Sequence, residues 1–102
     1  MSKILRWSVF VSVVLLLLTN VAVAAGDAAA GKEKASTCTS CHGVDGQGTD
    51  DKTKISGLSV GKFKEAMQAY KSGERKNAMM EMFAKKLSDQ DVEDLAAYYA
   101  SK

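Results

Sequence analysis

Both cysteines and the only histidine of this 102-residue chain lie within five consecutive residues, Cys38-Thr39-Ser40-Cys41-His42. Two thiols at this spacing on a turn can each form a thioether with one vinyl edge of a porphyrin, and the adjacent imidazole then reaches the iron. The pattern is typical of c-type haem attachment. It predicts one covalently attached haem c, with thioethers at Cys38 and Cys41 and with His42 as the proximal iron ligand.

Three other interpretations of these cysteines are weaker. A disulfide between Cys38 and Cys41 would close too small a loop to constrain the unfolded chain much. A thiol oxidoreductase site would be expected beside a βαβ pattern, which this sequence does not show. A structural zinc site takes four ligands, whereas two cysteines and one histidine offer three.

The first 24 residues have the features of an export signal. Lys3 and Arg6 precede an apolar run over 9–18, and Ala22-Val23-Ala24 supplies small residues at the spacing that signal peptidase cleaves. The run is much shorter than the roughly twenty residues that span a bilayer, so an uncleaved membrane anchor is the weaker alternative. We expect cleavage after Ala24 and a soluble periplasmic domain over 25–102, with no stable membrane insertion.

Without that segment the chain is electrically balanced and poor in core residues. The whole chain has a formal charge of +2 and an apolar content of 46%, and residues 1–24 raise both values. The other 78 residues carry 12 basic and 12 acidic side chains. This balance gives no basis for nucleic-acid binding. So small a core supplies only a few kcal/mol, whereas burying on the order of 500 Å² of porphyrin at about 25 cal/mol per Å² would add roughly 10 kcal/mol.

Capping and periodicity predict an all-α domain with three main helices and one or two short ones. The main helices are expected from Asp27 to about Thr37, over about 60–72, and from Ser88 to the end of the chain. A short Met-rich helix is expected over about 78–86, and an extended loop over 41–57. The expected core consists of Phe63, Met67, Tyr70, Phe83, Leu87, Val92, Leu95, Tyr98 and Tyr99.

The second axial ligand should be a methionine, because the chain has no second histidine. Such a ligand keeps oxygen and peroxide off the iron of an electron-carrying haem, and Met/His ligation raises its reduction potential. Met67 lies on the apolar stripe of the helix expected over 60–72, where a core role is the better interpretation. Spacing alone does not choose among Met79, Met80 and Met82.

Several further motifs accompany Cys38–Gly43: Asp45-Gly46, Gly73-Glu74-Arg75-Lys76, Met79-Met80, Leu87-Ser88-Asp89-Gln90-Asp91 and Leu95-Ala96-Ala97-Tyr98-Tyr99. With them, the chain over 25–102 resembles the small bacterial monohaem class I c-type cytochromes. The resemblance implies the class I cytochrome c fold around one covalently bound haem. It also implies that the first and last helices cross near the haem, with Tyr98 or Tyr99 in the contact.

The resemblance also bears on the axial methionine. In similar proteins the methionine ligand stands seven residues before the position of Leu87, which falls on Met80. Met80 is therefore the expected distal ligand of the haem iron. Met79 and Met82 are the weaker candidates, and both are otherwise expected to pack against the ring edge.

One departure from the family concerns the orientation of His42. Many relatives place a proline in the loop before the position of Gly57, whereas this chain has no proline and carries Lys54 there. Because a ligating imidazole needs a hydrogen-bond acceptor for its other nitrogen, we expect a backbone carbonyl between Thr53 and Gly57 to accept the Nδ1 proton. Arg75 has two open interpretations, a partner of a haem propionate or a solvated surface charge.

These features predict a periplasmic one-electron carrier that transforms no substrate and is therefore not an enzyme. The alternative is a haem-based binder of small ligands, or a minor peroxidase, in which the methionine ligand is labile. The chain is too short for an elaborate distal pocket, which favours the carrier. The expected partners are redox proteins, namely a reductase and a terminal oxidase or peroxidase, that dock transiently on a monomer.

The charged residues suggest how such docking is steered. Lysines gather in the segments expected around the methionine, and acidic residues gather at the start of the last helix, which predicts a charge dipole. The alternative is that both groups are ordinary solvated helix faces. The basic group is Lys62, Lys64, Lys71, Lys76, Lys85 and Lys86, and the acidic group is Asp89, Asp91, Glu93 and Asp94.

Overall fold

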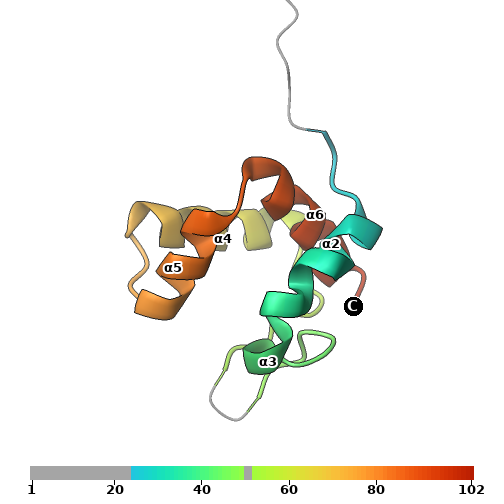
Figure 1. Ribbon diagram of the computed structural model, residues 1–102, viewed down its shortest axis with the longest axis horizontal. Coiled ribbons are helices and arrows are strands. Elements are labelled where there is room, and N and C mark those ends of the chain that lie inside the picture. The colour runs from blue at the N-terminus through green and yellow to red at the C-terminus, as the bar shows by residue number, and fades with distance from the viewer. Residues whose placement is uncertain (1–23, 50–51) are drawn as a thin grey trace, which may run out of the picture.

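The computed structural model describes residues 24–49 and 52–102, so the expected signal segment lies outside the described residues apart from Ala24. The described elements are helices, with a single isolated bridge between Thr49 and Lys52. They are α2 (Ala28–Lys34), the 3₁₀ turn η1 (Ala35–Thr37), α3 (Thr39–His42), α4 (Val60–Ser72), α5 (Ala78–Lys86) and α6 (Asp89–Ala100) (Figure 1). The prediction of three main helices and one or two short ones is confirmed. None of the helices in this part of the chain has the length and apolar character needed to cross a bilayer.

The helices begin and end where the capping residues predicted. The Asp27 carboxylate accepts hydrogen bonds from two amides in the first turn of α2, and the Ser59 hydroxyl accepts one in the first turn of α4. Ser88 and Asp91 form a reciprocal capping box at the start of α6, with both hydrogen bonds 3.0 Å long. Gly73 ends α4 with a φ of 78°, in the left-handed region. Each cap satisfies backbone groups that a helix leaves unpaired at its ends.

Helices α2 and α6 cross in direct backbone contact at Gly31 (Figure 1). A Cβ atom added to Gly31 would lie 2.1 Å from the carbonyl oxygen of Asp94 and 2.8 Å from Cβ of Tyr98. Only glycine therefore fits this crossing. The contact confirms that the first and last helices cross and that Tyr98 takes part.

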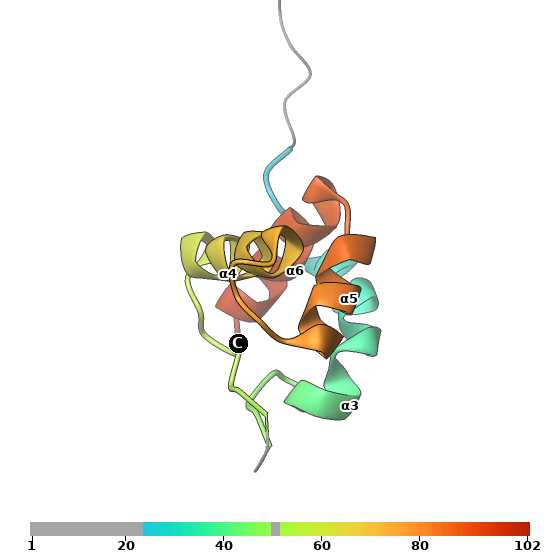
Figure 2. The ribbon, with the colours of Figure 1, turned by 90° about the vertical axis from the view of Figure 1, so that its left-hand side faces the viewer.

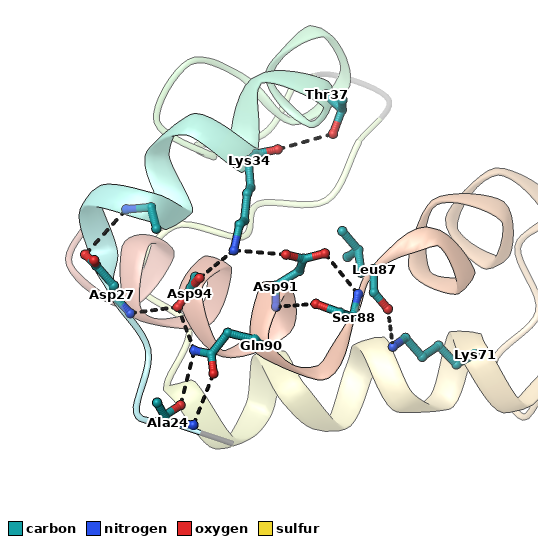
Figure 3. A network of polar contacts seen from close by, with 11 residues as sticks. Ala24, Asp27, Lys34, Thr37, Lys71, Leu87, Ser88, Gln90, Asp91 and Asp94 are labelled. Carbon is teal, nitrogen blue, oxygen red and sulfur yellow. Dashed lines mark hydrogen bonds and ion pairs between the residues drawn. The ribbon is translucent and has the colours of Figure 1, made fainter. Parts of the chain in front are cut away.

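A buried carboxylate joins the two crossing helices (Figure 3). Asp94 is 4% exposed and accepts hydrogen bonds from the Asp27 amide at 2.9 Å, Lys34 Nζ at 2.5 Å and Gln90 Nε2 at 3.0 Å. Lys34 also pairs with Asp91 at 2.9 Å. The Asp27 amide, followed by Lys34 and Gln90, lowers the pKa of Asp94 to about 2.

This shift predicts an acid-sensitive contribution to stability. Because the pKa of Asp94 is lower in the folded than in the unfolded chain, the unfolded chain takes up the proton first as pH falls. The stabilisation is therefore complete above about pH 4 and is lost as pH falls towards about 2. Denaturant unfolding of Asp94→Asn across this range should show a lower stability at neutral pH and a weaker acid dependence than the unmodified chain.

Asp45→Asn is the matched control, because Asp45 is exposed and makes only a 3.6 Å ion pair with Lys102. It should retain the acid dependence of the unmodified protein. Some acid dependence should also persist in Asp94→Asn, since Lys34 lowers the pKa of Asp91 as well. An acid dependence that is identical in Asp94→Asn and the unmodified protein would contradict the role assigned to Asp94.

The core contains most of the apolar residues that the sequence pattern indicated. Tyr70 and Leu87 pack at its edge, whereas Phe83 is only half-buried, with Lys86 Nζ 6.0 Å from its ring centroid, so its place in the core was predicted wrongly. The short α5 turns Ala84 inward in its place. The buried apolar residues are Ala35, Phe63, Met67, Ala84, Val92, Leu95, Ala96, Tyr98 and Tyr99.

Candidate functional site

The two cysteines lie on one helical turn. Cys38 is the N-cap of α3, and its carbonyl accepts from the His42 amide at 2.9 Å. Residues three apart on a helix share a face, so this turn presents Cys38 and Cys41 to the same side, as two thioethers to one ring require. Both thiols are free and partly buried, and Cys38 packs against the core. Helix α3 lies at the end of the molecule opposite the start of the described chain (Figures 1 and 2).

The His42 ring is oriented by one hydrogen bond. Its Nδ1 atom lies 2.7 Å from the carbonyl oxygen of Thr53. Because a carbonyl can only accept, Nδ1 carries the proton and Nε2 keeps a free lone pair for a metal ion. The expectation of a backbone carbonyl acceptor between Thr53 and Gly57 is confirmed. The acceptor is the carbonyl of Thr53, the first residue of that segment.

The loop that carries Thr53 is fixed to α6 without a proline. The carbonyl of Gly46 accepts from the Ile55 amide at 2.7 Å, and the His42 carbonyl accepts from the Gly48 amide at 2.7 Å. Gly46 has a φ of 76° and lies against Tyr99, so a Cβ atom there would be 2.7 Å from the ring. Backbone hydrogen bonds and this close approach thus hold the loop in place without a proline.

The three clustered methionines differ in their surroundings on α5. Met80 is half-buried and packs against the core, whereas Met79 and Met82 are 54% and 44% exposed. Asn77 caps α5 and accepts from the Met80 amide at 3.0 Å, a cap that we did not predict although asparagine is a favoured N-cap residue. Met67 is buried in the core, as expected. Helix α5 packs beside α4 (Figure 2).

These residues fit a covalently attached haem. The thiols are free, His42 has an available Nε2 atom, and Met80 offers a thioether beside the core. The hydroxyl of Tyr99 is also buried without a hydrogen-bond partner among the described residues. An unpaired buried polar group of this kind indicates that a neighbouring group completes the site.

Arg75 packs on an aromatic ring. Its guanidinium carbon lies 5.5 Å from the ring centroid of Tyr70, which is within the range of a cation–π contact. The side chain is exposed, and its amide donates to the carbonyl of Ala69 at 3.0 Å. This position favours the interpretation of Arg75 as a surface charge that covers Tyr70.

The acidic group at the start of α6 is paired with lysines, so the predicted charge dipole is wrong in its negative half. Two of the lysines that we expected on the basic side, Lys64 and Lys71, are among those partners. The ion pairs are Lys34 with Asp91 and Asp94, Lys64 with Glu93, and Lys71 with Asp89. Within the described part of the chain, no ion pair is made by Lys62, Lys76, Lys85 or Lys86.

Comparison with known proteins supports the same assignment. The family described as cytochrome c matches residues 28–101. The chain belongs to the cytochrome c family. This cytochrome is 45% identical over 82 residues to cytochrome c-554(548) of Halomonas halodenitrificans. The matched residues make up 76% of this chain and 99% of that protein. It is 44% identical over 94 residues to cytochrome c4 of Pseudomonas aeruginosa, over 90% of this chain and 47% of the relative.

The fold of this chain is similar to that of a solved cytochrome c4 structure. Reduced recombinant cytochrome c4 from Pseudomonas stutzeri matches with a TM-score of 0.71 and 38% identity, over 76% of this chain and 46% of that one. This cytochrome thus spans about half the length of the cytochromes c4 and nearly all of cytochrome c-554(548). The class I cytochrome c fold and the resemblance to small bacterial c-type cytochromes are confirmed. Family membership implies a covalently attached haem c and a role as an electron carrier.

Proposed function

We propose that this cytochrome is a periplasmic one-electron carrier with His/Met ligation. In this proposal the chain is cleaved after Ala24 and the haem is attached through Cys38 and Cys41. His42 and Met80 are the axial ligands. The observation that carries the proposal is the 2.7 Å contact between His42 Nδ1 and the Thr53 carbonyl, which leaves Nε2 free as a ligand.

The chain's residues hold and insulate the redox centre. When bound, the haem supplies an iron that accepts and releases one electron. Cys38 and Cys41 fix the position of the ring, and Thr53 fixes the orientation of the His42 imidazole. Met80 is half-buried and packs against the core, which makes it the best placed of the clustered methionines to supply the second ligand. If both His42 and Met80 held the haem iron, little room would remain there for a small ligand, which favours a carrier over a small-ligand binder or peroxidase.

The unpaired lysines favour partners with acidic docking surfaces. Lys76, Lys85 and Lys86 flank or end α5, and their charges have no ion-pair partner among the described residues. We propose that a reductase and a terminal oxidase or peroxidase dock transiently on this side of a monomeric carrier. Such steering acts on the association rate and is screened by salt.

The test is electron exchange with ferricyanide, a small anionic oxidant, measured by stopped flow. The oxidation rate should fall several-fold as ionic strength rises from about 10 mM to about 500 mM. Lys85→Glu should lower the rate at low salt. Lys32→Glu is the matched control, because it reverses an exposed charge on α2 and should change the rate less. A rate that does not depend on salt would contradict the steering proposal, and no oxidation by ferricyanide would contradict the carrier.

A further inference from the structure

A single lysine ties α5 to the rest of the molecule by a hydrogen bond (Figure 3). Lys71, in the last turn of α4, donates from Nζ to the carbonyl oxygen of Leu87 at 2.7 Å. Leu87 is the C-cap of α5, so its carbonyl lies at the negative end of that helix, where a cation is favoured. The Lys71 side chain is 20% exposed, so salt weakens this contact less than it would on the open surface.

The other attachments of α5 are few. Ala84 is its one buried residue, and Met80 and Leu87 pack at the edge of the core. Among the described residues, Lys71 makes the only side-chain hydrogen bond that reaches α5 and its caps from another part of the chain. Elements with few buried contacts open locally at a lower cost in free energy than the rest of a structure. The Lys71 contact is therefore a large part of what holds α5 in place.

A shift of α5 would carry Met80 with it. Met80 lies in the first turn of α5, and the hydrogen bonds between its turns make this helix of 9 residues move largely as one unit. Because Met80 packs against the core, α5 has to shift to make room for another ligand beside it. The free energy that holds α5 in place thus also opposes the replacement of Met80.

We propose that Lys71 is a positioning residue whose hydrogen bond to the Leu87 carbonyl holds α5, and with it Met80, against the core and so limits displacement of the methionine ligand by small molecules. This inference rests on the proposed function, since it takes Met80 as the axial ligand. Lys71 also lies 3.9 Å from Asp89, but that carboxylate is 83% exposed. Exposed ion pairs contribute little, so the hydrogen bond carries the effect.

The test is the binding of imidazole to the ferric, haem-loaded protein, followed as loss of the weak red-end band of methionine ligation. Imidazole is largely uncharged at about pH 8, so the loss of a lysine charge neither attracts nor repels it. Lys71→Met keeps the apolar stem of the side chain and removes the donor. It should bind imidazole roughly threefold to tenfold more tightly than the unmodified protein, because a hydrogen bond from a charged donor no longer holds α5.

Lys64→Met is the matched control. Lys64 lies on the same helix, and its ion pair goes to Glu93 of α6, away from α5. This variant removes the same charge and one contact between helices, so a merely structural loss of stability would affect both lysine variants. Asp89→Asn removes the longer ion pair of Lys71 and keeps its hydrogen bond. Both controls should bind imidazole with the affinity of the unmodified protein.

A second measurement needs no variant. In the reduced, diamagnetic protein, NMR should detect a scalar coupling across the hydrogen bond, between Lys71 Nζ and the carbonyl carbon of Leu87. Absence of this coupling would overturn the inference. Equal imidazole affinity in Lys71→Met and the unmodified protein, or an equal gain in Lys64→Met, would also overturn it. Absence of the red-end band from the unmodified protein, or its persistence in Met80→Ala, would instead contradict the proposed function.

Discussion

Replacing Met80 with alanine is expected to abolish the weak ferric absorption band near the red end of the spectrum that reports sulfur ligation. Met80 is the half-buried member of the methionine cluster and packs against the core. In the proposed site, the iron would then keep one protein ligand, His42. The reduction potential should fall by on the order of tenths of a volt, since axial ligands shift haem potentials over about 0.8 V. Absorption spectroscopy and a redox titration measure both effects.

Met79→Ala is the matched control for Met80→Ala. Met79 is the preceding residue on α5 and is 54% exposed, so its replacement should leave the band and the potential nearly unchanged. Met82→Ala should behave in the same way, because Met82 is 44% exposed. Retention of the band in Met80→Ala, together with its loss in either control, would reassign the distal ligand.

Replacing Cys38 or Cys41 with alanine is expected to block normal covalent attachment and to leave the chain poorly folded. Three of the nine buried apolar residues of the described chain are alanines, so the polypeptide core is small. A porphyrin that buries on the order of 500 Å² would contribute roughly 10 kcal/mol, comparable to the net stability of a small domain. Far-ultraviolet circular dichroism and denaturant unfolding should show reduced helix content and no cooperative transition.

Ser40→Ala is the control for the cysteine variants. Ser40 lies between the two cysteines and is exposed, so its replacement keeps the attachment spacing. It should yield a haem-loaded protein with normal unfolding. A cysteine variant that is free of haem yet well folded and cooperative would contradict the view that haem completes the core.

The helices and most of the core were predictable because their signals are local. Asp27, Ser59 and Ser88 cap the helices that follow them, and Gly73 ends α4, since each acts on backbone groups within a few residues. The attachment motif is likewise local, which is why Cys38 and Cys41 fall on one turn as expected. Phe83 was misplaced because α5 has only 9 residues and a short helix defines its buried face poorly.

Contacts between distant segments were less predictable. The sequence limited the acceptor of His42 to a short segment, but only the path of the loop selects Thr53. The pairing of Lys34 with Asp94 spans 60 residues and depends on the crossing of α2 and α6. The unpaired hydroxyl of Tyr99 also follows from packing against Phe63 and other distant residues, which no periodic pattern encodes.

The most direct test of the central claim is the ferric absorption spectrum, with intact mass, of the protein recovered from the periplasm. We expect a mass equal to residues 25–102 plus one haem, and a low-spin spectrum with the weak red-end band of methionine ligation. A high-spin ferric spectrum, or a polypeptide without covalently attached haem, would contradict the account.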